Sequence, residues 1–100
     1  MSSSPMDHLA ALRARIDETD RAIVALLARR RAIVEEMRVL KATHALPRID
    51  AAREAEMRAA LVTEAARLGV PEALVLAVLE AILADSRALV ATQSTTSGDS

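Results

Sequence analysis

The sequence predicts an all-α protein with one very long helix and two shorter helices, paired into an intertwined homodimer. Neither glycine nor proline occurs between Pro5 and Pro47, so nothing interrupts a helix over residues 6–43. Along this stretch, positions three and four residues apart in turn define one side of the helix, which we call the seam. The seam consists of Leu9, Leu12, Ile16, Thr19, Ile23, Leu26, Arg30, Ile33, Met37 and Leu40.

The length of this helix predicts the homodimer. The helix would measure about 57 Å, whereas a compact globule of this size has a radius of gyration of only about 13 Å. One copy of the chain cannot cover the seam. The simplest arrangement packs each long helix against its mate as well as against its own short helices.

Capping residues and helix breakers place the two shorter helices. Asp50 is suited to cap a helix that runs to about Leu68, and Gly69 is suited to end it. Pro71 fits the first turn of a third helix over about residues 71–92. The sequence therefore predicts one helical domain over residues 6–92. The polar segments 1–5 and 93–100 are expected to be disordered.

Composition and charge exclude several functional classes. The chain is 52% hydrophobic and 27% charged, which is typical of a soluble globular domain, and its formal net charge is −1. No overall basic field would attract nucleic acid or an anionic membrane. Cysteine is absent, and His8 and His44 have no metal-ligand spacing. We therefore expect no metal and no other cofactor.

Neither a secretory signal nor a membrane span is visible in the sequence. The N-terminus lacks a basic segment followed by an apolar run, and the apolar stretch from Leu74 to Ala84 is broken by Glu80 and too short to cross a bilayer. We expect a cytoplasmic protein. The run Arg29–Arg31 is weak evidence for nucleic-acid binding, because the chain has no aromatic side chain on which a base could stack.

A cation in the seam indicates an anion site. Arg30 occupies a position where a hydrophobic side chain is expected, and a buried guanidinium requires an anion and hydrogen bonds around it. Lys41 lies eleven residues further along nearly the same face, so the two side chains can converge on a small anion. Arg13 lies about 25 Å from Arg30, so near the same ligand it would have to come from the partner chain. Taken singly, Arg13 and Lys41 are also compatible with ordinary surface cations.

Polar residues on the faces of the shorter helices repeat this pattern. Arg53 and Glu54 share a stripe with hydrophobic residues of the second helix, and Ser86 is the polar member of a seam on the third. Taken singly, Arg53 and Glu54 fit a solvated first turn, and Ser86 fits a hydroxyl bonded to its own helix. Their coincidence with Arg30 favours a polar ligand site.

The chain resembles a known family in three segments, LRARIDETDRAIVALLARRRAIVEEMRVLKA, PRIDAARE and LEAILADSRAL. These segments are similar to the all-helical, AroQ-type chorismate mutases, and the resemblance covers about residues 9–90 without a gap. It implies an enzyme of aromatic amino acid biosynthesis that converts chorismate to prephenate. It also implies two interlocked chains, with each active site completed by an arginine of the other subunit.

The resemblance implies a role for each candidate residue. Arg30 and Arg13 of the partner subunit would bind the two carboxylates of the dianionic substrate, with Ser86 and Arg53 nearby. Lys41 would donate a hydrogen bond to the ether oxygen. Glu54, with the backbone around Asp50, would hold the ring hydroxyl at C4. The Claisen rearrangement needs neither a nucleophile nor a cofactor, so positioning and cationic donors would supply the catalysis.

One position departs from the family pattern. Four residues after the serine, where the family commonly has Gln or Glu to donate to the ether oxygen, this chain has Val90. Loss of one such donor typically costs about 10² to 10³ in rate. This departure leaves open a 4-amino-4-deoxychorismate mutase or an isochorismate pyruvate lyase on the same fold. A further alternative is a weakly active or regulatory helical module that needs a partner enzyme.

Overall fold

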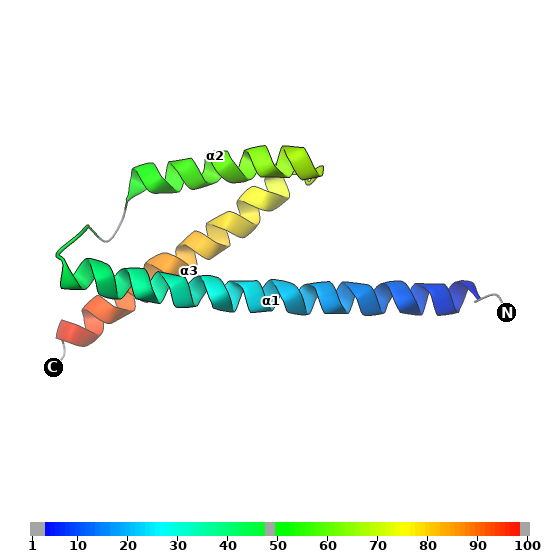
Figure 1. The fold of residues 1–100 in the computed structure, drawn as a ribbon, viewed down its shortest axis with the longest axis horizontal. Helices are drawn as coiled ribbons and strands as arrows, with labels where there is room; N and C mark the ends of the chain where they lie inside the picture. The colour runs from blue at the N-terminus through cyan, green and yellow to red at the C-terminus, as the bar shows by residue number, and fades with distance from the viewer. Residues whose placement is uncertain (1–3, 48–49, 99–100) are drawn as a thin grey trace. The chain divides into compact units, whose positions relative to one another are not determined.

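The computed structural model describes residues 4–47 and 50–98, and for residues 92–98 it describes the backbone alone. These residues form the helices α1 (Pro5–Thr43), α2 (Ala51–Leu68) and α3 (Glu72–Gly98), coloured along the chain in Figure 1. The described residues contain no strand. The predicted all-α class, with one very long helix and two shorter ones, is confirmed.

Helix α1 begins at Pro5 because Ser4 caps it. The Ser4 hydroxyl accepts a hydrogen bond from the backbone N–H of Asp7 at 3.1 Å, and the Asp7 carboxylate accepts one from the Ser4 N–H at 3.4 Å. This reciprocal capping box, with proline in the first helical position, fixes the start. Ser4 and Pro5 therefore do not belong to a disordered segment, and residues 1–3 of the segment expected to be disordered lie outside the described residues.

Helix α1 ends in a left-handed residue that is not glycine. Ala45 has a φ of 55°, and the N–H of Leu46 donates to the carbonyl of Lys41 at 2.8 Å. This is the bonding pattern of a Schellman-type helix end, in which glycine is the usual left-handed residue. Pro47 follows, and its missing N–H prevents the helix from continuing.

Helix α2 has the two caps that the sequence predicts. The Asp50 carboxylate accepts a hydrogen bond from the N–H of Arg53 at 3.0 Å, which confirms Asp50 as the N-cap. Gly69 adopts a φ of 71° at the C-terminal end, and the N–H of Val70 donates to the carbonyl of Ala65 at 2.9 Å. A side chain at Gly69 would meet no neighbouring atom within 4 Å, so only its backbone conformation requires glycine there.

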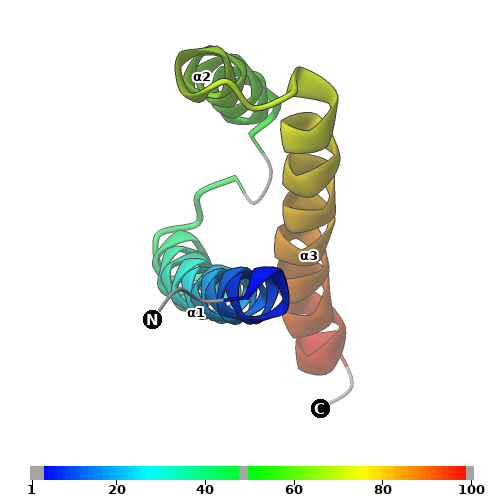
Figure 2. The ribbon, with the colours of Figure 1, turned by 90° about the vertical axis from the view of Figure 1, so that its right-hand side faces the viewer.

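Helices α2 and α3 form a helical hairpin. They meet at the turn that contains Gly69 and diverge away from it (Figures 1 and 2). Ala65 of α2 and Leu79 and Leu83 of α3 are buried and form the core of the hairpin. The predicted face of α3, with Val75, Leu79, Ile82, Ser86 and Leu89, lies at least partly buried, and Leu83 extends it.

Helix α3 continues beyond its predicted end near residue 92 and runs to Gly98. The prediction was wrong because the polar residues after Val90 include no glycine or proline before Gly98, and polarity alone does not stop a helix. Residues 99 and 100 of the predicted disordered tail lie outside the described residues.

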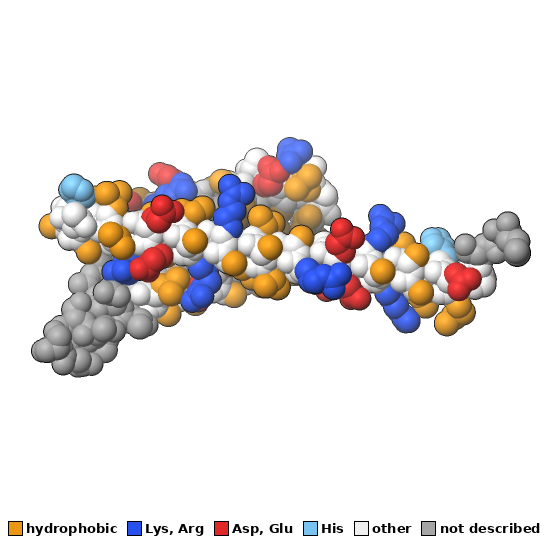
Figure 3. Space-filling model, turned by 60° about the horizontal axis from the view of Figure 1, so that its bottom comes forward, with side chains coloured by type: hydrophobic (Ala, Val, Ile, Leu, Met, Phe, Trp, Pro, Cys, Tyr) orange, Lys and Arg blue, Asp and Glu red, His pale blue; other side chains and the backbone are white. Residues whose placement is uncertain are grey.

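The seam of α1 is exposed in the single chain. The chain divides into two units, residues 1–34 and 35–100, and α1 contributes to both. No residue of α1 is buried, and its large hydrophobic seam side chains are between 38% and 61% exposed. Figure 3 shows hydrophobic side chains along the surface of α1. Hydrophobic surface of this extent is unusual for a soluble monomer.

Candidate functional site

Helix α1 carries three of the predicted site residues. Arg30 and Lys41 are half-buried, although most of their neighbours on α1 are exposed, and Arg13 is exposed. Arg30 belongs to the first unit and Lys41 to the second, and both lie on one uninterrupted helix. Arg13 lies two turns from the start of the helix and about 25 Å from Arg30.

Arg53 and Glu54, which the sequence places on one stripe of α2, have different surroundings in the structure. The Arg53 side chain is exposed, and its guanidinium lies 3.7 Å from the carboxylate of Glu56 on the same helix. The Glu54 side chain is only 18% exposed and points to α3. The Arg53 side chain is therefore solvated, as the alternative interpretation of this turn predicts, and the Glu54 side chain is not. Asp50 stays at the helix start, where its carboxylate caps the backbone.

Helix α3 presents Ser86 and Val90 on its partly buried face. The hydroxyl of Ser86 donates to the carbonyl of Ile82 at 3.1 Å, so it bonds its own helix. A serine in this arrangement can still accept a hydrogen bond from a ligand. Val90 lies one turn further along the same helix, and its side chain offers a ligand only hydrophobic contact.

Four charged residues between α2 and α3 form an ion-pair network that sequence reasoning missed in part. The Arg87 guanidinium of α3 donates to both carboxylate oxygens of Glu54, with Nε 3.3 Å from Oε2 and Nη2 bonded to Oε1. Arg58 of α2 donates to Glu80 of α3 at 2.7 Å, and its Nη2 lies 4.0 Å from Oε1 of Glu54. We call Glu54, Arg58, Glu80 and Arg87 the α2–α3 network.

The hydrogen bonds of the α2–α3 network shift the pKa values of Arg58, Glu80 and Arg87. The hydrogen bond from Arg58 lowers the pKa of the Glu80 carboxyl. The hydrogen bond to Glu54 raises the pKa of the Arg87 guanidinium. Both effects follow from stabilisation of the charged form by an opposite charge.

Of the four residues of the α2–α3 network, sequence reasoning identified only Glu54. The available signal was spacing, since Glu54 and Arg58 share one face of α2, and Glu80 and Arg87 share one face of α3.

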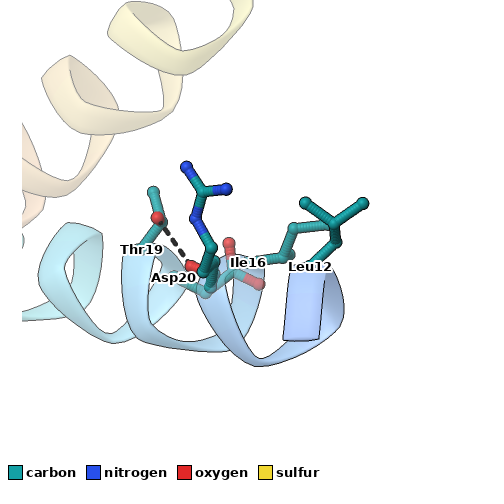
Figure 4. A pocket seen from close by; sticks show the side chains of 5 residues that line it. Leu12, Ile16, Thr19 and Asp20 are labelled. Atoms are coloured by element: carbon teal, nitrogen blue, oxygen red, sulfur yellow. Dashed lines mark hydrogen bonds between the residues drawn. The ribbon is translucent and has the colours of Figure 1, made fainter. Parts of the chain in front are cut away.

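A shallow hollow lies on the N-terminal part of α1 (Figure 4). Its lining includes Leu12, Ile16 and Thr19 of the seam, together with Arg15 and Asp20. The Thr19 hydroxyl donates to the carbonyl of Arg15 at 2.8 Å. The hollow contains none of the predicted site residues, and its hydrophobic lining is the exposed seam itself. It is therefore part of the uncovered surface of one helix.

Residues 4–47 and 50–98 contain no cluster of three or more histidine, aspartate or glutamate side chains arranged to hold a metal ion. In the same part of the chain, no helix combines the length and the hydrophobicity needed to span a bilayer.

Comparison with known proteins identifies similar chains. A family model described as "Chorismate mutase type II" matches residues 12–91. The curated protein "T-protein" of Enterobacter agglomerans is 41% identical over 78 residues, which make up 78% of this chain and 21% of that protein. The chain thus spans about a fifth of the length of this relative. No solved structure matches the chain.

Proposed function

Because the chain belongs to the type II chorismate mutase family, we propose that it is an isomerase that converts chorismate to prephenate. One observation carries this proposal. The family match over residues 12–91 includes all eight candidate site residues, from Arg13 on α1 to Val90 on α3. The cations among them suit a dianionic substrate, and the Claisen rearrangement requires no nucleophile.

The proposed mechanism depends on positioning and charge. Arg30 and Arg13 of the partner subunit bind the two carboxylates and hold the substrate in a compact chair, which brings the reacting carbons together. Lys41 donates to the ether oxygen, which gains negative charge as its bond to the ring breaks. This interaction strengthens in the transition state, and it therefore lowers the barrier. Glu54 accepts a hydrogen bond from the ring hydroxyl at C4, close to the backbone around Asp50.

The proposed active enzyme is a homodimer. Two features support it: the seam of α1 is exposed in the single chain, and Arg13 is too far along α1 to reach a ligand at Arg30 of the same chain. A second copy would cover the seam and bring its own Arg13 to the site. A cytoplasmic location remains part of the proposal.

Val90 supports a second candidate activity. Its side chain cannot donate to the ether oxygen, so chorismate turnover is expected to be slower than in a site with a donor at this position. A 4-amino-4-deoxychorismate mutase or an isochorismate pyruvate lyase would use the same two-carboxylate anchoring. A regulatory module that gains activity with a partner enzyme is the remaining alternative, and the greater length of the related "T-protein" is compatible with it.

A substrate panel tests the proposed function. The purified chain of residues 1–100 is incubated separately with chorismate, isochorismate and 4-amino-4-deoxychorismate, and the products are identified by mass spectrometry. The proposal requires prephenate from chorismate. Exclusive turnover of another substrate would replace the proposal with one of the alternatives. Absence of all turnover by the isolated chain would favour the regulatory module.

A further inference from the structure

The hydrogen bonds between Arg87 and Glu54 join the two helices of the hairpin at a residue of the proposed site. Arg87 engages both carboxylate oxygens of Glu54, across a sequence separation of 33 residues. Such a two-point contact fixes the plane of a carboxylate as well as its position. The Glu54 side chain is 18% exposed and that of Arg87 is 42% exposed, so the pair lies at the edge of the hairpin.

The charge around Glu54 differs from that of an isolated carboxylate. Arg87 binds it directly, and the guanidinium of Arg58 lies 4.0 Å from Oε1. Arg58 is in turn bonded to Glu80, so the four charges of the α2–α3 network sum to zero. A carboxylate has about four lone-pair positions, so Glu54 can accept a further hydrogen bond from a ligand while Arg87 stays bound.

We propose that Arg87 is a positioning and specificity-determining residue, which orients Glu54 and offsets its charge so that the site prefers a neutral C4 hydroxyl to a C4 ammonium group. This inference rests on the proposed function, in which Glu54 faces the C4 substituent. It makes chorismate the preferred substrate over 4-amino-4-deoxychorismate. The family resemblance alone left that choice open.

The physical reason is the difference in charge between the two substituents. A hydroxyl needs only an acceptor of fixed direction, and Glu54 held by Arg87 provides one. An ammonium group gains from an unpaired carboxylate, but here it would also meet the positive charges of Arg87 and Arg58. Like charges at such distances disfavour the charged form of a group or its binding. Removal of Arg87 would leave Glu54 with more negative potential and would favour the ammonium substrate.

The test compares two substrates in variants of the full chain. The value of kcat/KM is measured for chorismate and for 4-amino-4-deoxychorismate, with the inhibition constant used for a compound that is not turned over. Wild type should prefer chorismate. In Arg87→Gln, the preference should fall by about tenfold, which is the effect expected from loss of one neighbouring charge. Arg87→Lys keeps the charge and should restore most of the preference, even if Arg87→Gln folds poorly.

A matched control separates specificity from stability. Arg67→Gln removes an exposed arginine of α2 that pairs with Glu64 on its own helix, and it should leave the preference unchanged. An equal loss for both substrates in Arg87→Gln would show a merely structural role and overturn the inference. A wild-type preference for 4-amino-4-deoxychorismate would also overturn the inference, although the chain would still be a mutase. Failure of wild type to process either compound would refute the proposed function, and the inference would fall with it.

Discussion

Arg30 is a cation at a position of the seam where a hydrophobic side chain is expected. It occupies a seam position of α1, is half-buried, and lies among hydrophobic seam residues such as Leu26 and Ile33. A guanidinium in such surroundings loses hydration that only an anion and hydrogen bonds can replace. In the proposed enzyme, a substrate carboxylate is that anion. Arg30 is therefore the residue whose replacement best separates ligand binding from folding.

We expect Arg30→Ala to abolish turnover with little change in helix content, because alanine favours the helix and the carboxylate anchor is gone. Substrate should raise the melting temperature of wild type and leave that of the variant unchanged, since a ligand stabilises only the state that binds it. Circular dichroism with and without chorismate measures both effects. If Arg30 instead served an internal ion pair, its loss would destabilise the chain and substrate would shift neither melting curve.

Val90 is the residue at which this chain departs from its family. Val90→Gln would supply a donor to the ether oxygen, and we expect kcat for chorismate to rise by up to about 10² while KM changes less. The gain would appear mainly in kcat because the new bond strengthens as charge develops. Steady-state kinetics over the substrate panel measure it. Unchanged rates with every substrate would mean that residue 90 does not face the ligand.

At the scale of the helices, local signals predicted most of what the structure contains. The two caps of α2 could be predicted because Asp50 and Gly69 act through their own backbone and near neighbours. The end of α3 at Gly98 was missed because a run of polar residues without glycine or proline does not by itself stop a helix. The pairing of Arg87 with Glu54 could not be predicted from spacing, since it depends on the angle at which two helices meet.

The α2–α3 network should make the stability of the hairpin depend on pH. The pKa of Glu80 is lowered from 4.5 by its hydrogen bond with Arg58, so the folded state favours the ionised carboxyl. Such a group adds stability above the unfolded pKa and loses it as pH falls through the folded pKa. We expect Glu80→Gln to be less stable than wild type at pH 7, and the difference in stability to shrink as the pH falls below 4.5 and through the lowered pKa of Glu80. Urea unfolding at pH 7 and at a series of acidic pH values measures the difference, which is modest because the pair is exposed.

At the scale of the whole molecule, the exposed seam predicts that folding and association are coupled. Sedimentation at micromolar concentration should give about twice the chain mass of 10.7 kDa. The melting temperature should rise with protein concentration, because the dimer dissociates as it unfolds. A helical monomer that stays folded on dilution, with a melting temperature independent of concentration, would contradict the intertwined homodimer.

The unbroken course of α1 from Pro5 to Thr43 has a genetic consequence. In the proposed dimer, one helix delivers Arg30 to its own site and Arg13 to the opposite site, so a single subunit can be defective in two different ways. Arg13→Ala and Arg30→Ala homodimers should each be inactive. Refolded together in equal amounts, they should recover about a quarter of wild-type activity, because half of the dimers are mixed and each mixed dimer carries one intact site. Mixing without refolding supplies the control, and coexpression of the two defective genes should show complementation in a cell that depends on this enzyme.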